Sequence, residues 1–323
     1  MADGPAGGTS FATVVAGRRH EATNIVSFQL LPLAAQSLPA FTAGAHVDVR
    51  VTADIVRQYS ICSDPRGSGH YRLAVLAEAH SRGGSAGIHA GFVDGTVVNI
   101  GAPRNHFYLD ETAGRSILLA GGIGITPLLA MAYRLSALGR DFALHYCVRS
   151  SDRAAFRDEL TAGPLAPHTA IHCDDGADAQ RFVLSRVLSR PAADAHVYVC
   201  GPPGFISLIT EGAQRLGWPA GRVHVEHFKA DVEVTGDSFV VRTAGGMTIT
   251  IPPDKSIAAT LAEHGVAVTL LCEQGVCGTC LTPVLEGEPE HRDFCQSAAE
   301  KAANRMIAIC CSRAKSAVLV LDL

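Results

Sequence analysis

Three cysteines fall within the nine residues CEQGVCGTC near the end of the chain, at Cys272, Cys277 and Cys280. Four residues separate the first two and two residues separate the last two, and a further cysteine, Cys310, follows after 29 residues. Thiols at such short spacing can converge on one metal centre when the loop between them is tight. Part of a chain with this stretch is therefore expected to fold around a bound metal centre.

The spacing C-x4-C-x2-C with a distant fourth cysteine is that of a plant-type [2Fe-2S] cluster. Zinc ligands more often form two separate pairs, whereas this chain has a triplet and a single cysteine. Gly275 and Gly278 lie within the triplet and allow backbone amides to turn towards the sulfurs. Cys311 could replace Cys310, because adjacent strand residues face opposite sides, but the 29-residue gap favours Cys310. The predicted metal ligands are therefore Cys272, Cys277, Cys280 and Cys310.

Composition limits the kind of protein that carries this centre. The chain has 323 residues and ten cysteines, and its N-terminus lacks the apolar segment of a secretory signal. We therefore expect a cytoplasmic protein whose thiols bind metal or are buried rather than paired in disulfides. A formal charge of -4 gives no basic footprint for nucleic acid, and no apolar run approaches the roughly 20 residues that span a membrane.

Sequence patterning divides the chain into three domains. Residues 8–110 contain short alternating runs such as IVSFQL and HVDVRV, which are typical of an antiparallel barrel or sandwich. Residues 111–230 alternate buried-strand runs such as VYVC with helical patterns such as TPLLAMAYRLSAL and RFVLSRVL, which indicates a parallel α/β sheet. The polar stretch 231–237 is interpreted as a linker. Residues 238–323 contain a predicted hairpin around Gly245 and Gly246, a short helix that ends at Gly265, and the cysteine triplet.

Two turns in the α/β segment follow predicted strands and suit a nucleotide. LLAGGIGITPLLAMA places glycines between a strand and a helix, where a pyrophosphate can lie at the helix N-terminus. The glycines do not complete G-x-G-x-x-G, and such turns also occur for packing alone. VYVCGPPGF ends a second strand at the carboxyl edge, where open sheets bind ligands. The candidate cofactor-binding residues here are Gly121, Gly122, Gly124, Cys200, Gly201 and Pro202.

The barrel segment offers a second set of ligand-binding candidates. In RQYSIC, Arg57 and Tyr59 share a face of a strand and could flank a planar, phosphorylated ligand. SRGGS opens a predicted helix whose free amides could hold a phosphate, although most such serines only cap helices. The full set of candidates is Arg57, Tyr59, Ser60, Val75, Gly83, Gly84 and Ser85.

Together the three segments resemble the phthalate dioxygenase reductase type of Rieske oxygenase reductases, and within it the vanillate O-demethylase reductases. The resemblance extends from about residue 11 to the C-terminus and rests on RQYSIC, SRGGS, APRN, AGGIGITP, CGPPGF, CEQGVCGTC and CCSRAKS. It includes the uncommon order of flavin, nicotinamide and ferredoxin domains. The implied fold is multidomain: an antiparallel β-barrel flavin domain, an α/β parallel-sheet nicotinamide domain and an α+β β-grasp plant-type ferredoxin domain.

The resemblance also implies cofactors and residue roles. FMN would be held by Arg57, Tyr59 and Ser60, with its phosphate on the SRGGS turn. Thr126 would approach the flavin near N5, Phe228 would shield the flavin face that the nicotinamide enters, and Glu226 would lie beside it. Leu76 departs from relatives that have a basic residue near the flavin.

The implied function is the reductase component of a two-component Rieske-type aromatic oxygenase or O-demethylase. NADH would give a hydride to FMN, and single electrons would pass through the [2Fe-2S] cluster to the oxygenase. We expect a monomer. Two alternatives stay open: an FAD-dependent reductase of another monooxygenase, and a relay protein that uses no nicotinamide. The two glycine turns argue against the relay, because a simple carrier needs no pyrophosphate site.

Two further features bear on coenzyme and partner. After the strand LHYCV, Arg149 would favour the 2′-phosphate of NADPH, whereas Asp152 would favour the ribose 2′-hydroxyl of NADH. These residues do not decide between the coenzymes, so only the resemblance favours NADH. From residue 233 onward the chain has 11 acidic and 7 basic residues, which accounts for the whole net charge of -4. Glu286, Glu288 and Glu290 alternate on a predicted exposed turn and either steer docking to a basic oxygenase surface or only keep the domain soluble.

Overall fold

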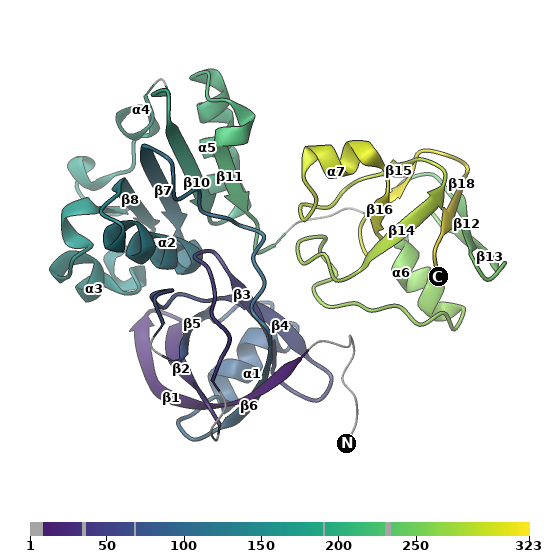
Figure 1. Ribbon diagram of the computed structural model, residues 1–323, viewed down its shortest axis with the longest axis horizontal. Coiled ribbons are helices and arrows are strands. Elements are labelled where there is room, and N and C mark those ends of the chain that lie inside the picture. The colour runs from purple at the N-terminus through teal and green to yellow at the C-terminus, as the bar shows by residue number, and fades with distance from the viewer. Residues whose placement is uncertain (1–8, 34–36, 68, 190, 230–233) are drawn as a thin grey trace. The chain divides into compact units, whose positions relative to one another are not determined.

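The computed structural model describes residues 9–33, 37–67, 69–189, 191–229 and 234–323. The chain forms two compact units, one of which spans Gly8–Phe228 while the other contains Lys229–Leu323. Figure 1 shows the strands and helices of each unit. Residues 231–233 of the linker expected at 231–237 lie outside the described residues, and the boundary expected at 110/111 falls inside the larger unit.

The first part of the larger unit is an antiparallel six-stranded sheet. Its elements are β1 (Ser10–Ala22), β2 (Ile25–Pro32), β3 (His46–Arg50), β4 (Val56–Ser60), β5 (Tyr71–Leu76), α1 (Gly84–Gly91) and β6 (Val97–Gly101). The strands lie in the order β4-β3-β6-β1-β2-β5, and an isolated bridge joins Ile61, just after β4, to Leu73 within β5. Alternation in HVDVR places Val47 and Val49 in the apolar interior with no exposed surface, as the sequence pattern predicts.

The second part of the larger unit is a parallel five-stranded sheet in the order β11-β10-β7-β8-β9. Its strands are β7 (Arg115–Gly121), β8 (Asp141–Val148), β9 (Thr169–Cys173), β10 (Ala195–Cys200) and β11 (Val223–Glu226). Its α-helices are α2 (Ile125–Ala137), α3 (Arg157–Ala162), α4 (Leu184–Val187) and α5 (Pro203–Arg215). The expected helix over TPLLAMAYRLSAL is confirmed as α2. The helix expected over RFVLSRVL is shorter than expected, because only the single turn α4 forms there.

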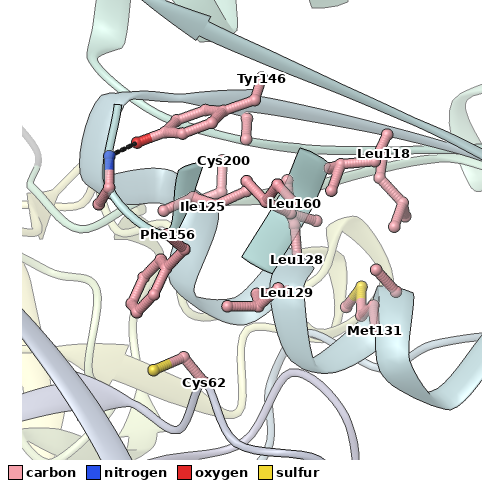
Figure 2. Packing of buried hydrophobic residues seen from close by; sticks show 14 of the residues in the cluster. Cys62, Leu118, Ile125, Leu128, Leu129, Met131, Tyr146, Phe156, Leu160 and Cys200 are labelled. Atoms are coloured by element: carbon pink, nitrogen blue, oxygen red, sulfur yellow. Dashed lines mark hydrogen bonds between the residues drawn. The ribbon is translucent and has the colours of Figure 1, made fainter. Parts of the chain in front are cut away.

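Two apolar clusters cover the two faces of this sheet. Helix α2 packs on one face, where Leu118 and Tyr146 lie among its leucines (Figure 2). Helix α5 packs on the other face through Ile206 and Ile209. The strand RSILLAG is buried on both faces after its first residue, which is why it appears in the sequence as a continuous apolar run.

The barrel and the α/β part share a core inside the larger unit. Cys62 of the barrel belongs to the same apolar cluster as Phe156 and Leu160 (Figure 2). Arg72 on β5 donates two hydrogen bonds of 2.8 Å to the carboxylate of Glu159 on α3, and its guanidinium lies 4.9 Å from the centre of the Phe156 ring. These contacts fix the barrel against the carboxyl-end face of the parallel sheet.

The smaller unit is a mixed five-stranded sheet in the order β13-β12-β18-β14-β16. Its elements are β12 (Phe239–Thr243), β13 (Thr248–Ile251), α6 (Ile257–Glu263), β14 (Leu281–Glu286), β15 (Pro289–Glu290), α7 (Ala298–Ala303), β16 (Met306–Ala308), β17 (Arg313–Ala314) and β18 (Val318–Leu321). The expected hairpin is confirmed, since β12 and β13 pair antiparallel. The expected helix is confirmed as α6, which Ser256 caps at its start and which is followed by Gly265 at φ 77°.

No helix in the described parts of the chain is both long and apolar enough to cross a bilayer.

Candidate functional site

The two glycine-containing turns of the α/β part meet at the carboxyl ends of β7 and β10, which are neighbouring strands. A β-carbon at Gly124 would stand 2.7 Å from the amide nitrogen of Gly201 and closer still to the carbonyl oxygen of Cys200. A β-carbon at Gly121 would stand 2.9 Å from both Phe205 and Pro202. Only glycine lets the turns approach so closely, and a 3₁₀ turn over Gly122–Gly124 then leads directly into α2 at this edge.

Glu226 ends β11 at the same edge, directly opposite Cys200 in the pairing of β10 and β11. Oε2 of Glu226 is buried and has no hydrogen-bond partner among the described residues, and burial raises the pKa of this carboxyl to about 8. Burial, with a smaller contribution from Glu226, also raises the pKa of the Cys200 thiol. A neutral acid therefore lies beside a neutral thiol at this edge near pH 7.

Thr126 and Phe228 lie close to this pair. Thr126 is 2% exposed, and its hydroxyl donates to the carbonyl of Ile123 at 3.1 Å, so its lone pairs remain for another donor. Phe228 is half-buried against the apolar cluster that contains Ile125 and Cys200. The structure thus brings Thr126, Cys200, Glu226 and Phe228 to one edge of the sheet.

The SRGGS turn and Arg57 form a second candidate site at the start of α1. Gly83 has φ 84°, and a β-carbon at Gly84 would stand 2.7 Å from Cγ of Arg57. The Arg57 guanidinium donates to the carbonyls of Val56 at 2.8 Å and Arg82 at 3.2 Å. A cation therefore lies against the N-terminus of an eight-residue helix with glycines at its first positions. This arrangement fits a phosphate group.

The other barrel candidates are placed differently. Ser85 is buried, and its hydroxyl accepts a hydrogen bond from the Glu78 amide at 3.1 Å, so it shapes the turn from inside. Tyr59 is half-buried, and burial raises its pKa to about 12. Val75 faces the barrel interior, and its carbonyl accepts from Nε2 of His89 at 2.9 Å, so its side chain has no free face for a ligand.

Sequence reasoning gave no role to His46, which the structure places directly opposite Ser60 in the β3–β4 pair. Alternation in HVDVRV identifies a strand but not the register of its neighbour. Only the pairing shows that this buried imidazole and the Ser60 hydroxyl share a face.

The four predicted metal ligands of the smaller unit lie together as two pairs. The thiols of Cys272 and Cys277 lie close enough to shift each other's pKa, and so do those of Cys280 and Cys310. No three His, Cys, Asp or Glu side chains in the described residues converge on a single metal ion. A two-iron cluster requires two thiolates on each iron, so an arrangement of two and two fits it better than it fits one zinc ion.

The loop backbone distinguishes Cys310 from Cys311. Gly275 and Gly278 both have φ 70°, and the Gly275 amide donates to the Cys310 sulfur. Cys311 instead directs its thiol to the carbonyl of Ala308 at 3.6 Å, and a β-carbon on Gly275 would stand 2.6 Å from its sulfur. The thiol of Cys295 donates to Asp293 at 3.4 Å and makes no such pair.

Comparisons with known proteins identify the domains that carry the candidate residues. The family model of the 2Fe-2S iron-sulfur cluster binding domain matches residues 242–315, and that of the oxidoreductase NAD-binding domain matches residues 118–211. The vanillate O-demethylase oxidoreductase of Pseudomonas sp. (strain HR199 / DSM 7063) is 44% identical over 96% of this chain and 99% of its own. That of Acinetobacter baylyi (strain ATCC 33305 / BD413 / ADP1) is 40% identical over 96% of this chain and 98% of its own.

Among solved structures, phthalate dioxygenase reductase superposes with a TM-score of 0.73 at 38% identity, over 97% of this chain and 98% of its own. Its title describes a modular structure for electron transfer from pyridine nucleotides to [2Fe-2S]. The multidomain fold expected from the sequence is thereby confirmed. With full-length relatives at this identity, the chain belongs to the family of oxygenase reductases that includes the vanillate O-demethylase oxidoreductases and phthalate dioxygenase reductase.

Proposed function

We propose that this chain is the NADH-dependent reductase component of a two-component Rieske-type oxygenase or O-demethylase that acts on aromatic substrates. The observation that carries the proposal is that one chain contains both four thiols arranged as two pairs and an α/β nucleotide fold. One part of the chain suits a nicotinamide and the other suits a one-electron centre. Free thiols at all ten cysteines support a reducing, cytoplasmic location.

Bound FMN would take up two electrons as a hydride and release them singly to the [2Fe-2S] cluster, which passes them on. In the barrel, Arg57 and the amides after Gly83 and Gly84 hold the FMN phosphate, with Ser85 supporting the turn. Tyr59 and Ser60 line the flavin ring. Val75 is excluded from side-chain contact by its inward orientation.

The α/β part orients the nicotinamide. Gly121, Gly122 and Gly124, together with Cys200, Gly201 and Pro202, leave room for the dinucleotide at the carboxyl edge. Thr126 would lie near the reacting edge of a bound flavin, and Phe228 would cover the flavin face that the nicotinamide enters. Glu226 keeps its proton near pH 7 because it is buried, so it offers a hydrogen-bond donor and no negative charge.

The cluster would be held by Cys272 and Cys277 on one iron and by Cys280 and Cys310 on the other. The Gly275 amide stabilises the Cys310 sulfur through its hydrogen bond. The oxygenase partner is a separate protein, and the reductase acts as a monomer.

Anaerobic titration of the purified protein with NADH tests this function. We expect loss of flavin absorbance followed by loss of cluster absorbance, and release of FMN on denaturation. Release of FAD instead would favour the reductase of another monooxygenase. A spectrum that does not change with NADH would contradict the proposal and leave only an electron-relay protein. Reduction of a Rieske oxygenase then tests the partner.

A further inference from the structure

His46 and Ser60 are neighbours across the β3–β4 pair. The backbone amide and carbonyl of His46 bond to Arg104 on the other side of β3, at 2.8 and 2.9 Å. The position opposite Ser60 is therefore a non-hydrogen-bonded one, in which two facing side chains stand closest in an antiparallel sheet. Ser60 belongs to the flavin-facing motif proposed above, so His46 lies one side chain behind that site.

The imidazole of His46 is buried and incompletely bonded. It is 7% exposed, and its Nε2 has no hydrogen-bond partner among the described residues. An unpaired buried nitrogen costs about 1–3 kcal/mol, so its presence here requires a reason. The atom is free to accept a proton from a group on the same face, and Ser60 is the residue directly opposite.

A route leads from His46 to the surface. The ring of His106 lies 5.5 Å from that of His46, centre to centre, and His106 is exposed. The charged and titratable groups around His46 are Arg104 and His106 from the loop after β6, and Asp48 from its own strand. Asp48 is occupied by Arg104, to which it accepts two hydrogen bonds of 2.7 and 2.8 Å.

These surroundings keep His46 neutral at rest. Burial, together with the charges of Arg104 and His106, lowers the pKa of His46 to about 3. A neutral imidazole has one nitrogen that accepts and one that donates, and with so low an affinity it holds an added proton only briefly. His46 can therefore pass a proton on but cannot store one.

The reaction leaves one proton to remove. NADH gives up a hydride, which carries two electrons and one proton, whereas each cluster takes up one electron and no proton. One NADH and two oxidised clusters therefore yield NAD⁺, two reduced clusters and one proton. That proton starts at the flavin site.

We propose that Ser60, His46 and His106 form a proton relay that carries this proton from the flavin site to water. The Ser60 oxygen takes up the proton while its own hydroxyl proton moves to Nε2 of His46. Nδ1 of His46 then releases its proton to His106, which exchanges it with solvent. The inference rests on the proposed function, because it requires a flavin beside Ser60.

The test follows proton release separately from hydride uptake. The complete flavin- and cluster-containing protein is mixed with NADH and excess cytochrome c in weak buffer that contains a pH-indicator dye, in a stopped-flow instrument. In His46→Ala, hydride uptake, seen as the first loss of flavin absorbance, should keep its rate. Proton release and electron passage to the cluster should slow about 100-fold, within the usual range for loss of an acid–base group. Added imidazole should restore them, which it would not do for a purely structural defect.

Three further variants make the result decisive. His46→Gln keeps a hydrogen-bonding side chain but cannot carry a proton, so it should behave like His46→Ala, without the rescue. His106→Asn should slow proton release less, because water can replace an exposed group. His20→Gln, an exposed histidine on β1, is the matched control and should behave as the wild type.

Two outcomes would overturn the relay. One is proton release at the wild-type rate in both His46 variants with full flavin content. The other is loss of flavin from both variants, which would make His46 a cofactor-holding residue. Failure of the proposed function would look different, since the wild-type protein itself would then show no flavin reduction by NADH.

Discussion

Gly124 and Cys200 belong to different turns, yet a β-carbon on Gly124 would overlap the Cys200 carbonyl oxygen and stand 2.7 Å from the next amide nitrogen. Both obstacles are backbone, so neither can rotate away. The approach holds the ends of β7 and β10 together at the edge where we propose that the nucleotide binds. We therefore expect the close fit of these turns to shape the binding site.

Gly124→Ala should consequently separate the two turns. We expect a loss of about 1–3 kcal/mol in stability, as for other overpacked sites, and a raised KM for NADH. Trp218 is the single tryptophan and is buried in the same unit, so its fluorescence follows unfolding of this part in denaturant. Gly221→Ala is the control, because nothing lies within 4 Å of its added methyl group. Equal stability of both variants would contradict this reading of the turn.

The thiol pairs predict which cysteine is the fourth ligand. Cys310→Ser should lose cluster absorbance and iron, because its sulfur pairs with Cys280, while NADH still reduces the flavin. Cys311→Ser should keep both the cluster and flavin reduction, since its thiol bonds to Ala308 instead. Iron analysis and the visible spectrum distinguish the two, and a full iron content in Cys310→Ser would rule out the assignment.

Glu226 predicts a pH dependence of stability. Its pKa is about 8 in the folded protein against an ordinary value of 4.5. Between these values the unfolded chain releases the proton while the folded chain keeps it, so the free energy of unfolding falls as pH rises. Glu226→Gln has no titratable group at this position, so its free energy of unfolding should not fall in this way. The variant should therefore gain stability relative to the wild type from pH 5 to pH 8, by on the order of a few kcal/mol.

Denaturant unfolding followed by Trp218 fluorescence at both pH values measures this difference. Glu211→Gln is the control, because that carboxylate is exposed on α5. A difference between wild type and Glu226→Gln that does not change with pH would show that the carboxyl is already ionised in the folded protein.

Coenzyme choice should not depend on Asp152. Its two carboxylate oxygens accept hydrogen bonds from Ser150 and from Thr23 of the barrel, so both are already occupied. We expect NADH to have the higher kcat/KM, and Asp152→Asn to leave the ratio of NADH to NADPH efficiency unchanged. A shift of that ratio towards NADPH in the variant would show that Asp152 reads the ribose after all.

Local sequence patterns predicted the elements that depend on local chemistry. Ser256 and Gly265 delimit α6, and the alternation in HVDVRV marks β3. The apolar residues of RFVLSRVL have helical spacing, but Phe182 packs against Phe205 of α5, and the chain on either side of α4 is extended. Tertiary packing therefore overrides periodicity there.

The sequence motifs named most of the candidate site, but contacts between distant residues had to come from the fold. Val75 faces inward, and His46 meets Ser60 only through strand register. The sequence made Asp152 a candidate for binding the ribose, but its carboxylate accepts a hydrogen bond from Thr23, 129 positions away. Such pairings depend on register and docking, which spacing along the chain does not encode.

The acidic turn of the smaller unit bears on how the oxygenase docks. The expectation that three glutamates act together needs revision, because two have cationic partners. Glu288 accepts from Lys315 at 2.9 Å and Glu290 from Arg292 at 2.8 Å. Glu286 is exposed at the end of β14, next to Leu285, which is 53% exposed. An uncompensated charge beside an apolar side chain suits a partner surface with a basic rim.

Glu286→Gln should therefore lower the association rate with the oxygenase, and the deficit should shrink as salt rises, because charges are screened over about 8 Å at physiological ionic strength. Glu288→Gln should have the smaller effect, because the Glu288 charge is already paired with Lys315. Removing it leaves the Lys315 charge unpaired and changes the electric field around that pair. Stopped-flow electron transfer to the oxygenase measures the rate at several salt concentrations. NADH oxidation with cytochrome c as acceptor reports whether electron flow inside the reductase is intact. If Glu286→Gln and the wild type reduce the oxygenase equally fast at low salt, the acidic turn only keeps the domain soluble, and docking is governed by other residues.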